Sequence, residues 1–295
     1  MKVRIGIGAT GQGLSSQELE AMCVSLIEHG FDSIWVSEVL SQPGMDPLVS
    51  LGWLAGRLPK LKIGTTFLVP GRNLLRLARQ LSTLDQLSGG RLLLTAVPGL
   101  PRGAERHAVG VLPADRGSVM DVALPVLRSL LSGAATDVPG ETGVIEDLRL
   151  DPLPVQQPLE IWLGGNLPAA LERCGRLGDG WLPAMLTPAE AAAGKTRIDE
   201  VARSQGRTID PEHFGVSIAY ASEPLPLSMR DSLRARSRRP DAELLIPVGF
   251  DALRSQLETF LEVGFSKFVL RQLGTLGSFD IELGRLAAAV GELQT

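Results

Sequence analysis

Short apolar stretches alternate with amphipathic stretches along most of the chain. The apolar stretches are rich in Val, Ile and Leu and are bounded by Gly, Pro or Asp, which is typical of strands buried in a parallel sheet. The amphipathic stretches repeat their apolar residues at helical spacing. The pattern predicts strands at residues 3–9, 33–37, 62–68, 92–98, 160–165, 180–185, 214–220 and 267–271. It predicts helices at residues 15–29, 46–58, 74–87, 113–131, 168–177, 188–205, 251–263 and from about 280.

Strands that each lead into a helix predict an α/β protein with a parallel sheet, which is either open and doubly wound or closed into a (β/α)8 TIM barrel. A doubly wound dinucleotide-binding sheet carries a GxGxxG turn after its first strand. Here Gly11-Gln12-Gly13 leads to Leu14-Ser15-Ser16 instead. We therefore predict a closed barrel, and the length of 295 residues fits one such domain over residues 1–295.

One segment interrupts the alternation. Residues 99–157 contain a loop rich in Gly and Pro, a predicted helix and an irregular stretch that ends in Leu150-Asp151-Pro152-Leu153-Pro154. We interpret this segment as an insertion between strands 4 and 5. We expect it to lie over the C-terminal ends of the strands, because TIM-barrel enzymes have their active sites there.

Composition and charge narrow the functional classes. The net charge is −4 and 21% of the residues are charged, so an ordinary globular protein is expected. The densest basic run has no aromatic residue interleaved, which argues against nucleic-acid binding. It indicates a solvated helix face or loop, with an anionic ligand or partner as the alternative. The run comprises Arg234, Arg236, Arg238 and Arg239.

Neither a membrane segment nor a metal site is predicted. The first residues, MKVRIGIG, alternate like a strand and lack the apolar core of a signal peptide. No segment reaches the roughly 18 uninterrupted apolar residues of a membrane span. Cys23 and Cys174 lie in helical patterns without the close spacing of a redox or zinc site, so we expect buried thiols. A cytoplasmic protein without a bound metal is the resulting expectation.

Six motifs follow one another in an order that identifies a family resemblance. They are HGFDSIWVSE at 29–38, DPL at 46–48, KIGTT at 62–66, TLDQLSGGRL at 83–92, PLEIWLGGN at 158–166 and RLGDGWLP at 176–183. In this order they closely resemble the luciferase-like monooxygenase superfamily, in particular its actinobacterial branch of coenzyme F420-dependent oxidoreductases. The resemblance implies a (β/α)8 barrel with an insertion before strand 5. It also implies a flavin or deazaflavin ring across the barrel mouth, and a homodimer.

A glycine-rich turn is the candidate site for the cofactor phosphate, which the family holds near the loop after strand 5. Gly164-Gly165-Asn166 lies between a predicted strand and the helix that begins at Pro168. Backbone N–H groups at a helix N-terminus attract anions, and glycines let an anion approach the backbone closely. Asn166 is expected to cap the helix and to donate its side-chain amide. The alternative is an ordinary glycine-rich turn with an N-cap.

The resemblance places the cofactor ring against the ends of strands 3, 4 and 6. At Thr65 and Thr66 the family has a strained, bulged peptide that supports the central ring. The alternative is that the two threonines, and likewise the tryptophan of strand 6, pack as ordinary strand or core residues. The residues expected to line the ring are Thr65, Thr66, Ala96, Val97 and Trp181.

Charged residues at the ends of strands point to a site at the barrel mouth. Glu38 follows strand 2 and Arg271 ends strand 8, so both are expected to face the mouth, where a charge indicates a site more than stability. Glu38 is the candidate proton donor or orienting carboxylate, and the two residues could also form a salt bridge with each other. Arg72, after strand 3, is a candidate for an anionic group of cofactor or substrate, with plain solvent exposure as its alternative.

The histidine pattern departs from the family. Many F420-dependent members follow the acidic residue of strand 2 with a His that acts near the cofactor, whereas this chain has Val39. His29 lies in the first predicted helix and His213 precedes strand 7, so both are interpreted as structural. His107, in the loop after strand 4, is a weak catalytic candidate. Glu105, Val109-Gly110 and Arg116 match a family pattern and are expected to order the insertion.

Three functional hypotheses follow. In the leading one, the protein binds coenzyme F420 and transfers hydride between its deazaflavin ring and a small organic substrate. A second hypothesis keeps the barrel but uses reduced FMN and oxygen in a two-component monooxygenase. A third is a non-catalytic flavin-binding relative, which the missing His favours and which a closed or apolar substrate side of the mouth would mark.

Overall fold

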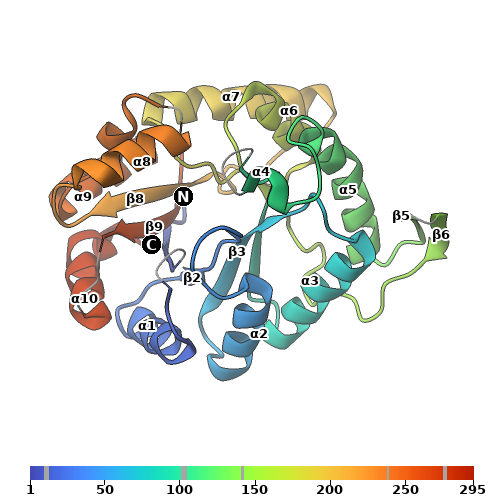
Figure 1. Cartoon of the computed structure of the whole chain (residues 1–295), viewed down its shortest axis with the longest axis horizontal. Helices are drawn as coiled ribbons and strands as arrows, with labels where there is room; N and C mark the ends of the chain where they lie inside the picture. Colours follow the sequence, from blue (N-terminus) through green and yellow to red (C-terminus); the bar gives the residue numbers. More distant parts are fainter. Residues whose placement is uncertain (10–12, 101–104, 141–142, 238, 275–277) are drawn as a thin grey trace.

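A curled parallel sheet surrounded by helices forms the body of the protein (Figure 1). The computed structural model describes residues 1–9, 13–100, 105–140, 143–237, 239–274 and 278–295. Seven strands pair in the order β7-β4-β3-β2-β1-β9-β8, and each neighbouring pair is parallel. Their bounds are β1 (Arg4–Gly8), β2 (Ser33–Trp35), β3 (Lys62–Leu68), β4 (Leu92–Val97), β7 (Trp162–Leu163), β8 (Gly215–Ala221) and β9 (Lys267–Leu273).

A short segment connects the two edges of this sheet. Trp181 forms isolated parallel bridges with Leu163 of β7 and with Phe214, next to β8. Its carbonyl accepts a hydrogen bond from the N–H of Gly215 at 2.9 Å. Residues 180–184 therefore occupy the position of the predicted sixth strand without forming a regular one. Pro183 contributes to this because proline has no N–H for the ladder.

The helices lie around the outside of the sheet, and four of them begin where a polar side chain caps the first turn. Ser15 with Glu18 and Thr187 with Glu190 form capping boxes, which satisfy backbone N–H groups at the starts of α1 and α7. The bounds are α1 (Ser16–Glu28), α2 (Pro47–Arg57), α3 (Leu74–Ser88), α5 (Arg116–Leu131), α6 (Pro168–Leu177), α7 (Pro188–Ser204), α9 (Phe250–Glu262) and α10 (Phe279–Val290). Each lies within a few residues of a predicted helix.

Two apolar layers hold the sheet. On the outer face Ile63 and Leu94 belong to the main core shared with the helices. Inside the curl, Trp35, Leu182 and Val269 form a second cluster, with Leu93 and Trp162 packed against it. Gly64 makes room for the indole, because a Cβ there would lie 2.4 Å from the Trp35 ring.

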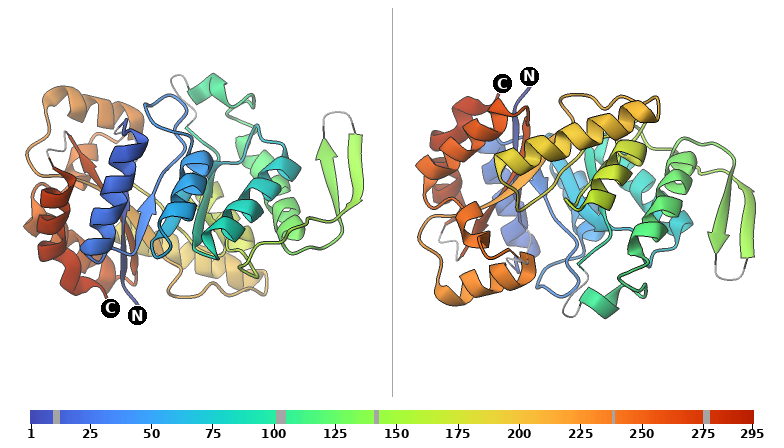
Figure 2. Two further views of the ribbon diagram at one scale, coloured as in Figure 1. Left: turned by 90° about the horizontal axis from the view of Figure 1, so that it is seen from below. Right: turned by 90° about the horizontal axis from the view of Figure 1, so that it is seen from above.

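The predicted insertion divides into two parts. Its first part contains α4 (Glu105–Ala108) on the same side as the C-terminal ends of the strands, as both views of Figure 2 show. Its second part is an antiparallel hairpin of β5 (Thr136–Gly140) and β6 (Gly143–Leu148), which projects sideways from the body. The expectation of an irregular stretch over the site is therefore wrong for the hairpin.

One further helix lies outside the predicted pattern. α8 (Leu227–Ser237) is followed by the 3-10 helix η1 (Ala242–Leu245), and Met229 and Leu233 of α8 pack against a small separate core. The basic run belongs to this region, and two of its arginines form ion pairs. Arg234 pairs with Asp231 and Glu243, and Arg239 pairs with Glu190 at 2.9 Å and with Asp241 at 3.0 Å. Arg234 is also exposed, as expected of a solvated face; Arg238 and the side chain of Arg236 lie outside the described residues.

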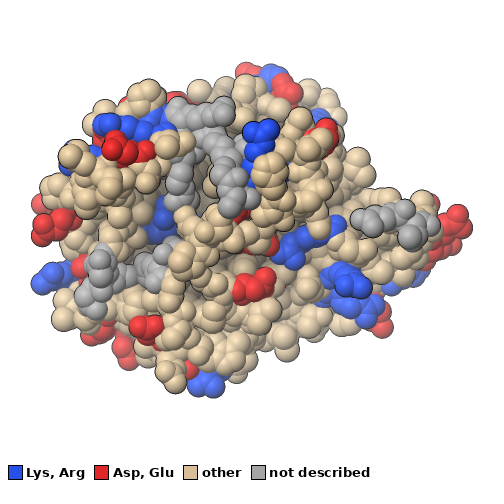
Figure 3. Space-filling model, in the orientation of Figure 1, with Lys and Arg blue, Asp and Glu red and all other residues tan. Residues whose placement is uncertain are grey.

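In the part of the chain that the structure describes, no helix is both long and apolar enough to span a membrane. On the face seen in Figure 3, acidic and basic side chains are scattered among uncharged ones.

Candidate functional site

The inner face of the sheet at the C-terminal ends of the strands forms the candidate site. Side chains alternate between the two faces of a strand, and Leu93 belongs to the inner cluster. Thr95 and Val97 of β4 therefore face inward, as does Thr66, which pairs with Thr95. Gly164 adjoins them, because a Cβ there would lie 2.6 Å from Val97 Cγ1. The structure brings these residues together at the mouth.

The same alternation shows that two of the residues expected to line the ring face away from the mouth. Thr65 and Ala96 are fully buried on the outer face of the sheet, with Ile63 and Leu94. Their side chains therefore face the helices and not the mouth. The pairing of β3 with β4 runs without interruption from Ile63–Leu92 to Leu68–Val97, so the bulge expected at Thr65 and Thr66 is absent from this strand pair.

The prediction that Trp181 lines the ring is also wrong, because Trp181 packs on the outside of the curled sheet. Its side chain is fully buried, its ring lies 5.9 Å from that of Phe265, and a Cβ on Gly194 of α7 would lie 2.4 Å from its Cη2 atom. Its Nε1 donates a hydrogen bond to the carbonyl oxygen of Gly165 at 2.8 Å. Trp181 thus supports the glycine turn from behind and does not form a wall of the mouth.

The glycine turn leaves the start of α6 open. Gly165 has a positive φ of 95°, a conformation that favours glycine. Leu167 occupies the N-cap position, and no side chain among the described residues caps the helix there. The helix begins at Pro168, as predicted, but the residue directly before it is Leu167. The expectation that Asn166 caps α6 is therefore wrong. Of the first-turn N–H groups, Pro168 has none and that of Ala170 donates to the Leu167 carbonyl at 2.8 Å, which leaves the Ala169 N–H and the positive end of the helix dipole to receive an anion.

Glu38 is held by a partner that the sequence did not suggest. Its Oε1 accepts from Arg72 Nη2 at 2.6 Å, and its Oε2 accepts from the Leu68 N–H at 2.8 Å. Arg72 Nε also donates to the Leu68 carbonyl at 2.9 Å. The carboxylate is 8% exposed and the guanidinium 22%. The pair therefore fixes the end of β3. It replaces the Glu38–Arg271 salt bridge that was the alternative for Glu38, and Arg72 is paired instead of simply solvent-exposed.

Arg271 lies at the mouth on another strand. Its side chain is half-buried on β9, and a Cβ on Gly8 of β1 would lie 3.5 Å from its Cβ. Arg271 is therefore on the inner face, as predicted.

The first part of the insertion is tied together by two buried charged residues. Arg116 is 2% exposed and donates hydrogen bonds to the carbonyls of Leu100, Glu105, Arg106 and Val111. Glu105 is 3% exposed and its Oε1 accepts from the Ser41 N–H at 2.6 Å, which links the insertion to the loop after β2. Both contacts confirm that these residues order the insertion.

The histidines and cysteines have the positions expected of them. His29 contacts Asp280 at 3.0 Å, and His213 contacts the Asp179 carbonyl at 2.9 Å, so both are structural. His107 is exposed on α4. Burial raises the pKa of the Cys23 thiol to about 12 and also raises the pKa of Cys174, so both are neutral thiols.

One functional candidate escaped the sequence analysis. Thr95 is fully buried, and its Oγ1 has no hydrogen-bond partner among the described residues. A buried hydroxyl without a partner is costly, so it marks a place where a bound group could donate or accept a hydrogen bond. A polar residue within the apolar run LLLTAV was the available signal. Thr65 Oγ1 is likewise unpartnered, but it faces the helices.

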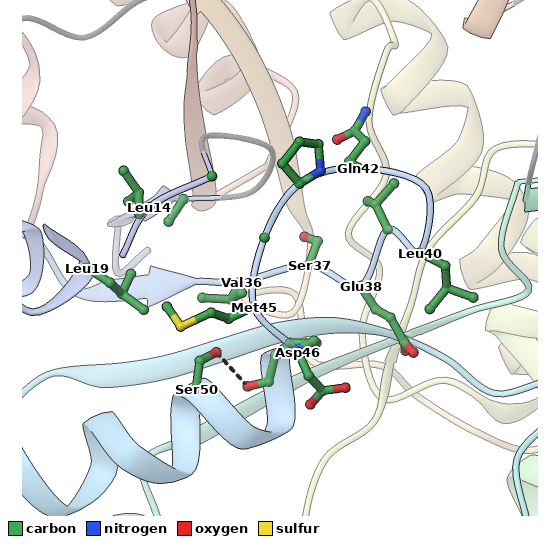
Figure 4. Close-up of a pocket in the computed structure, with 16 residues that line it drawn as sticks. Leu14, Leu19, Val36, Ser37, Glu38, Leu40, Gln42, Met45, Asp46 and Ser50 are labelled. Atoms are coloured by element: carbon green, nitrogen blue, oxygen red, sulfur yellow. Dashed lines mark hydrogen bonds between the residues drawn. The ribbon is translucent and has the colours of Figure 1, made fainter. Parts of the chain in front are cut away.

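A cavity of about 240 Å3 opens beside the mouth, between the loops that follow β1 and β2 (Figure 4). Its lining includes Leu14, Val36, Glu38, Val39 and Met45. Glu38 joins the cavity to the mouth, because its N–H donates to the Thr66 carbonyl at 2.7 Å.

Comparison with known proteins agrees with the curled-sheet architecture. Along its whole length the chain superposes on an F420-dependent secondary alcohol dehydrogenase in complex with an F420-acetone adduct, with a TM-score of 0.80 and 17% identity over 100% of both chains. A monooxygenase from Streptomyces bottropensis gives a TM-score of 0.77 and 19% identity over 98% of both chains. A coenzyme F420-dependent tetrahydromethanopterin reductase from Methanopyrus kandleri gives 0.78 and 15% over 100% of both. At these identities the likeness shows the fold alone.

Sequence comparison adds distant relatives. The chain is 28% identical over 192 residues to an F420-dependent glucose-6-phosphate dehydrogenase from Kineococcus radiotolerans, which covers 61% of this chain and 56% of the relative. A protein of the same name from Nakamurella multipartita is 28% identical over 199 residues, with the same coverage. The chain thus spans little more than half the length of these relatives. The model of the luciferase-like monooxygenase family matches residues 3–268, and the chain therefore belongs to the luciferase-like monooxygenase family.

Proposed function

We propose that the protein is an F420-dependent oxidoreductase, a closed (β/α)8 barrel in which residues 180–184 stand in for the sixth strand. In this proposal it transfers hydride between the deazaflavin and a small organic substrate. The observation that carries the proposal is the uncapped start of α6 behind the Gly164-Gly165 turn, which opens at the C-terminal ends of the strands. The relatives named as F420-dependent dehydrogenases support the choice of cofactor.

The residues at the mouth fit such a cofactor. The Ala169 N–H at the start of α6 would hold its phosphate, because a helix N-terminus carries a partial positive charge. The inward-facing Thr66 and Val97 would lie against its ring, and the unpartnered Thr95 hydroxyl would find a hydrogen-bond partner there. When bound, a deazaflavin supplies hydride transfer and reacts poorly with oxygen.

Glu38 acts as an orienting carboxylate in this proposal. Both of its oxygens already accept hydrogen bonds from positively charged or N–H donors. Because both oxygens are engaged in this way, we assign Glu38 an orienting role and not that of proton donor. Its contribution is to hold the end of β3 and the Arg72 side chain in place at the mouth. His107, exposed on α4, remains a weak candidate for proton transfer.

A titration with both cofactors tests the proposal. F420 and FMN are added separately to the protein while the fluorescence of each cofactor is recorded. The proposal predicts a saturable F420 response and weak or no FMN binding. Tight FMN binding without an F420 response would contradict it and favour a two-component monooxygenase; the Streptomyces bottropensis neighbour is named as a monooxygenase. Binding of F420 without turnover on a broad substrate panel would favour the non-catalytic relative.

We also propose a homodimer, as the family resemblance implies. Size-exclusion chromatography with light scattering should give twice the chain mass of 31.5 kDa. The monomer mass at every protein concentration would contradict this proposal.

A further inference from the structure

The cavity between the loops after β1 and β2 is lined by polar and apolar surface in similar amounts. Its apolar lining includes Leu14, Leu19, Val36, Val39 and Met45. Its polar lining includes the side chains of Ser37, Gln42 and Asp46, and Figure 4 shows the Glu38 carboxylate turned away from Leu14 and Leu19. Among the described residues of the lining there is no Lys, Arg or His.

Its two carboxylates already accept hydrogen bonds from other parts of the protein. Glu38 is paired with Arg72, as described above. Asp46 caps α2, where its Oδ1 accepts from the Val49 N–H at 3.0 Å. An anionic group in this cavity would meet two carboxylates without a cation in the described wall. A neutral molecule would meet no such penalty.

The size of the cavity sets a further limit. A volume of about 240 Å3 corresponds to roughly eight water molecules in the liquid. A small ring or short-chain molecule fits this space, whereas a hexose phosphate would nearly fill it and is dianionic. Asp46 Oδ2, which takes no hydrogen bond from the residues described, can accept one from a hydroxyl group.

We propose that this cavity binds the substrate and that the substrate is a small, uncharged alcohol or carbonyl compound. This inference rests on the proposed function. It separates the chain from its relatives named as glucose-6-phosphate dehydrogenases, whose named substrate is a phosphate ester. The carrying observation is a wall that holds two carboxylates and no described cation, and that adjoins the mouth through Glu38.

Methyl NMR on the full-length protein without cofactor tests the inference. The probes are cyclohexanol and glucose 6-phosphate, and the reporter is the 13C-methyl signal of Met45, assigned with a Met45→Leu variant. Cyclohexanol should shift this signal saturably, and glucose 6-phosphate at the same concentration should leave it in place. A Met45 signal that ignores cyclohexanol, or that responds equally to the sugar phosphate, would overturn the inference.

Two variants locate the binding. Val39→Trp, which fills the cavity, should weaken the cyclohexanol response at least tenfold. Leu40→Trp, in the same loop and 50% exposed, gives a second test if the first variant does not fold. The matched control is Val144→Trp on the β5–β6 hairpin, where the residue is 58% exposed and the response should be unchanged. An unweakened response in folded Val39→Trp or Leu40→Trp protein would also overturn the inference.

The outcome is separable from that of the proposed function. Binding of F420 without a Met45 response to cyclohexanol overturns the inference alone. A Met45 response in a protein that does not bind F420 overturns the proposed function and supports the chemistry inferred for the cavity.

Discussion

Replacing Leu167 with Asp tests the phosphate site at α6 directly. Leu167 is the N-cap residue of α6, has no capping side chain and is 71% exposed, so the change creates no steric conflict in the core. An Asp at this position would accept hydrogen bonds from the first-turn N–H groups. The carboxylate would thus occupy the groups that we assign to the cofactor phosphate, and would add a like charge beside it.

The structure sets the size of the two effects. An N-cap Asp stabilises a helix by about 1 kcal/mol relative to an apolar residue, and this gain is lost when a phosphate displaces it. Repulsion between two unit charges about 4 Å apart costs roughly 1 kcal/mol in water and about 4 kcal/mol near a protein surface. Because position 167 is largely exposed, the lower value applies. A total of about 2 kcal/mol corresponds to a Kd for F420 raised roughly thirtyfold.

Fluorescence titration of F420 into the variant measures this change, and thermal unfolding checks the fold. Leu167→Asp should unfold at the same or a slightly higher temperature while binding F420 more weakly. The matched control is Ile281→Asp, which places the same charge in the first turn of α10 at a residue that is 57% exposed. The control should bind F420 like the wild type. Unchanged F420 binding by Leu167→Asp would refute the assignment of the phosphate to α6.

Three further predictions address the supporting structure. Glu38→Gln removes the charge partner of Arg72 and should lower the free energy of unfolding by about 2 kcal/mol in urea denaturation; no loss would show that the pair does not stabilise the end of β3. Gly64→Ala places a Cβ 2.4 Å from the Trp35 ring and should lower the free energy of unfolding by about 1 to 3 kcal/mol. The control Gly56→Ala in α2, where a Cβ would have nothing within 4 Å, should be neutral or stabilising. Equal thermal stability of the two variants would contradict the packing inside the curl. The hydrogen bond from Arg234 lowers the pKa of Glu243 to about 2. The stabilising effect of this pair is therefore present above the ordinary Glu pKa of about 4.3 and is lost as the pH falls through about 2. An NMR titration of Glu243 should show this pKa, and Arg234→Gln should return the pKa toward the ordinary value.

The alternation of elements was predictable because it depends on local patterns. The helices surrounding the sheet and seven of the predicted strands appear within a few residues of their expected bounds. Apolar periodicity and caps such as Ser15 and Thr187 are encoded in neighbouring residues. The hairpin of residues 136–148 was missed because β6 is exposed almost throughout and therefore shows no apolar pattern.

The facing of strand residues was much harder to predict. A strand such as LLLTAV is apolar on both faces, so its sequence does not reveal which residues face the helices. Thr65 and Ala96 were therefore assigned to the mouth, although both face outward. Trp181 presents a related problem, because an indole fits a core as well as a site until its neighbour Gly194 is known.

Long-range charge pairing was equally inaccessible. Both Glu38 and Arg271 were expected at the mouth from their positions at strand ends. The two Glu38 oxygens accept hydrogen bonds from Arg72 and from the Leu68 N–H. These partners depend on how the loop after β3 folds back. Sequence alone placed the charges on the correct face but could not choose their partners.

A crystal structure of the protein with F420 bound tests the central claim most directly. We predict that the cofactor phosphate lies against the first-turn N–H groups of α6, beside the Gly164-Gly165 turn that Trp181 supports. The deazaflavin ring should lie over the inward-facing Thr66, Thr95 and Val97. Density for the phosphate at any other element, with the start of α6 left open, would contradict the account.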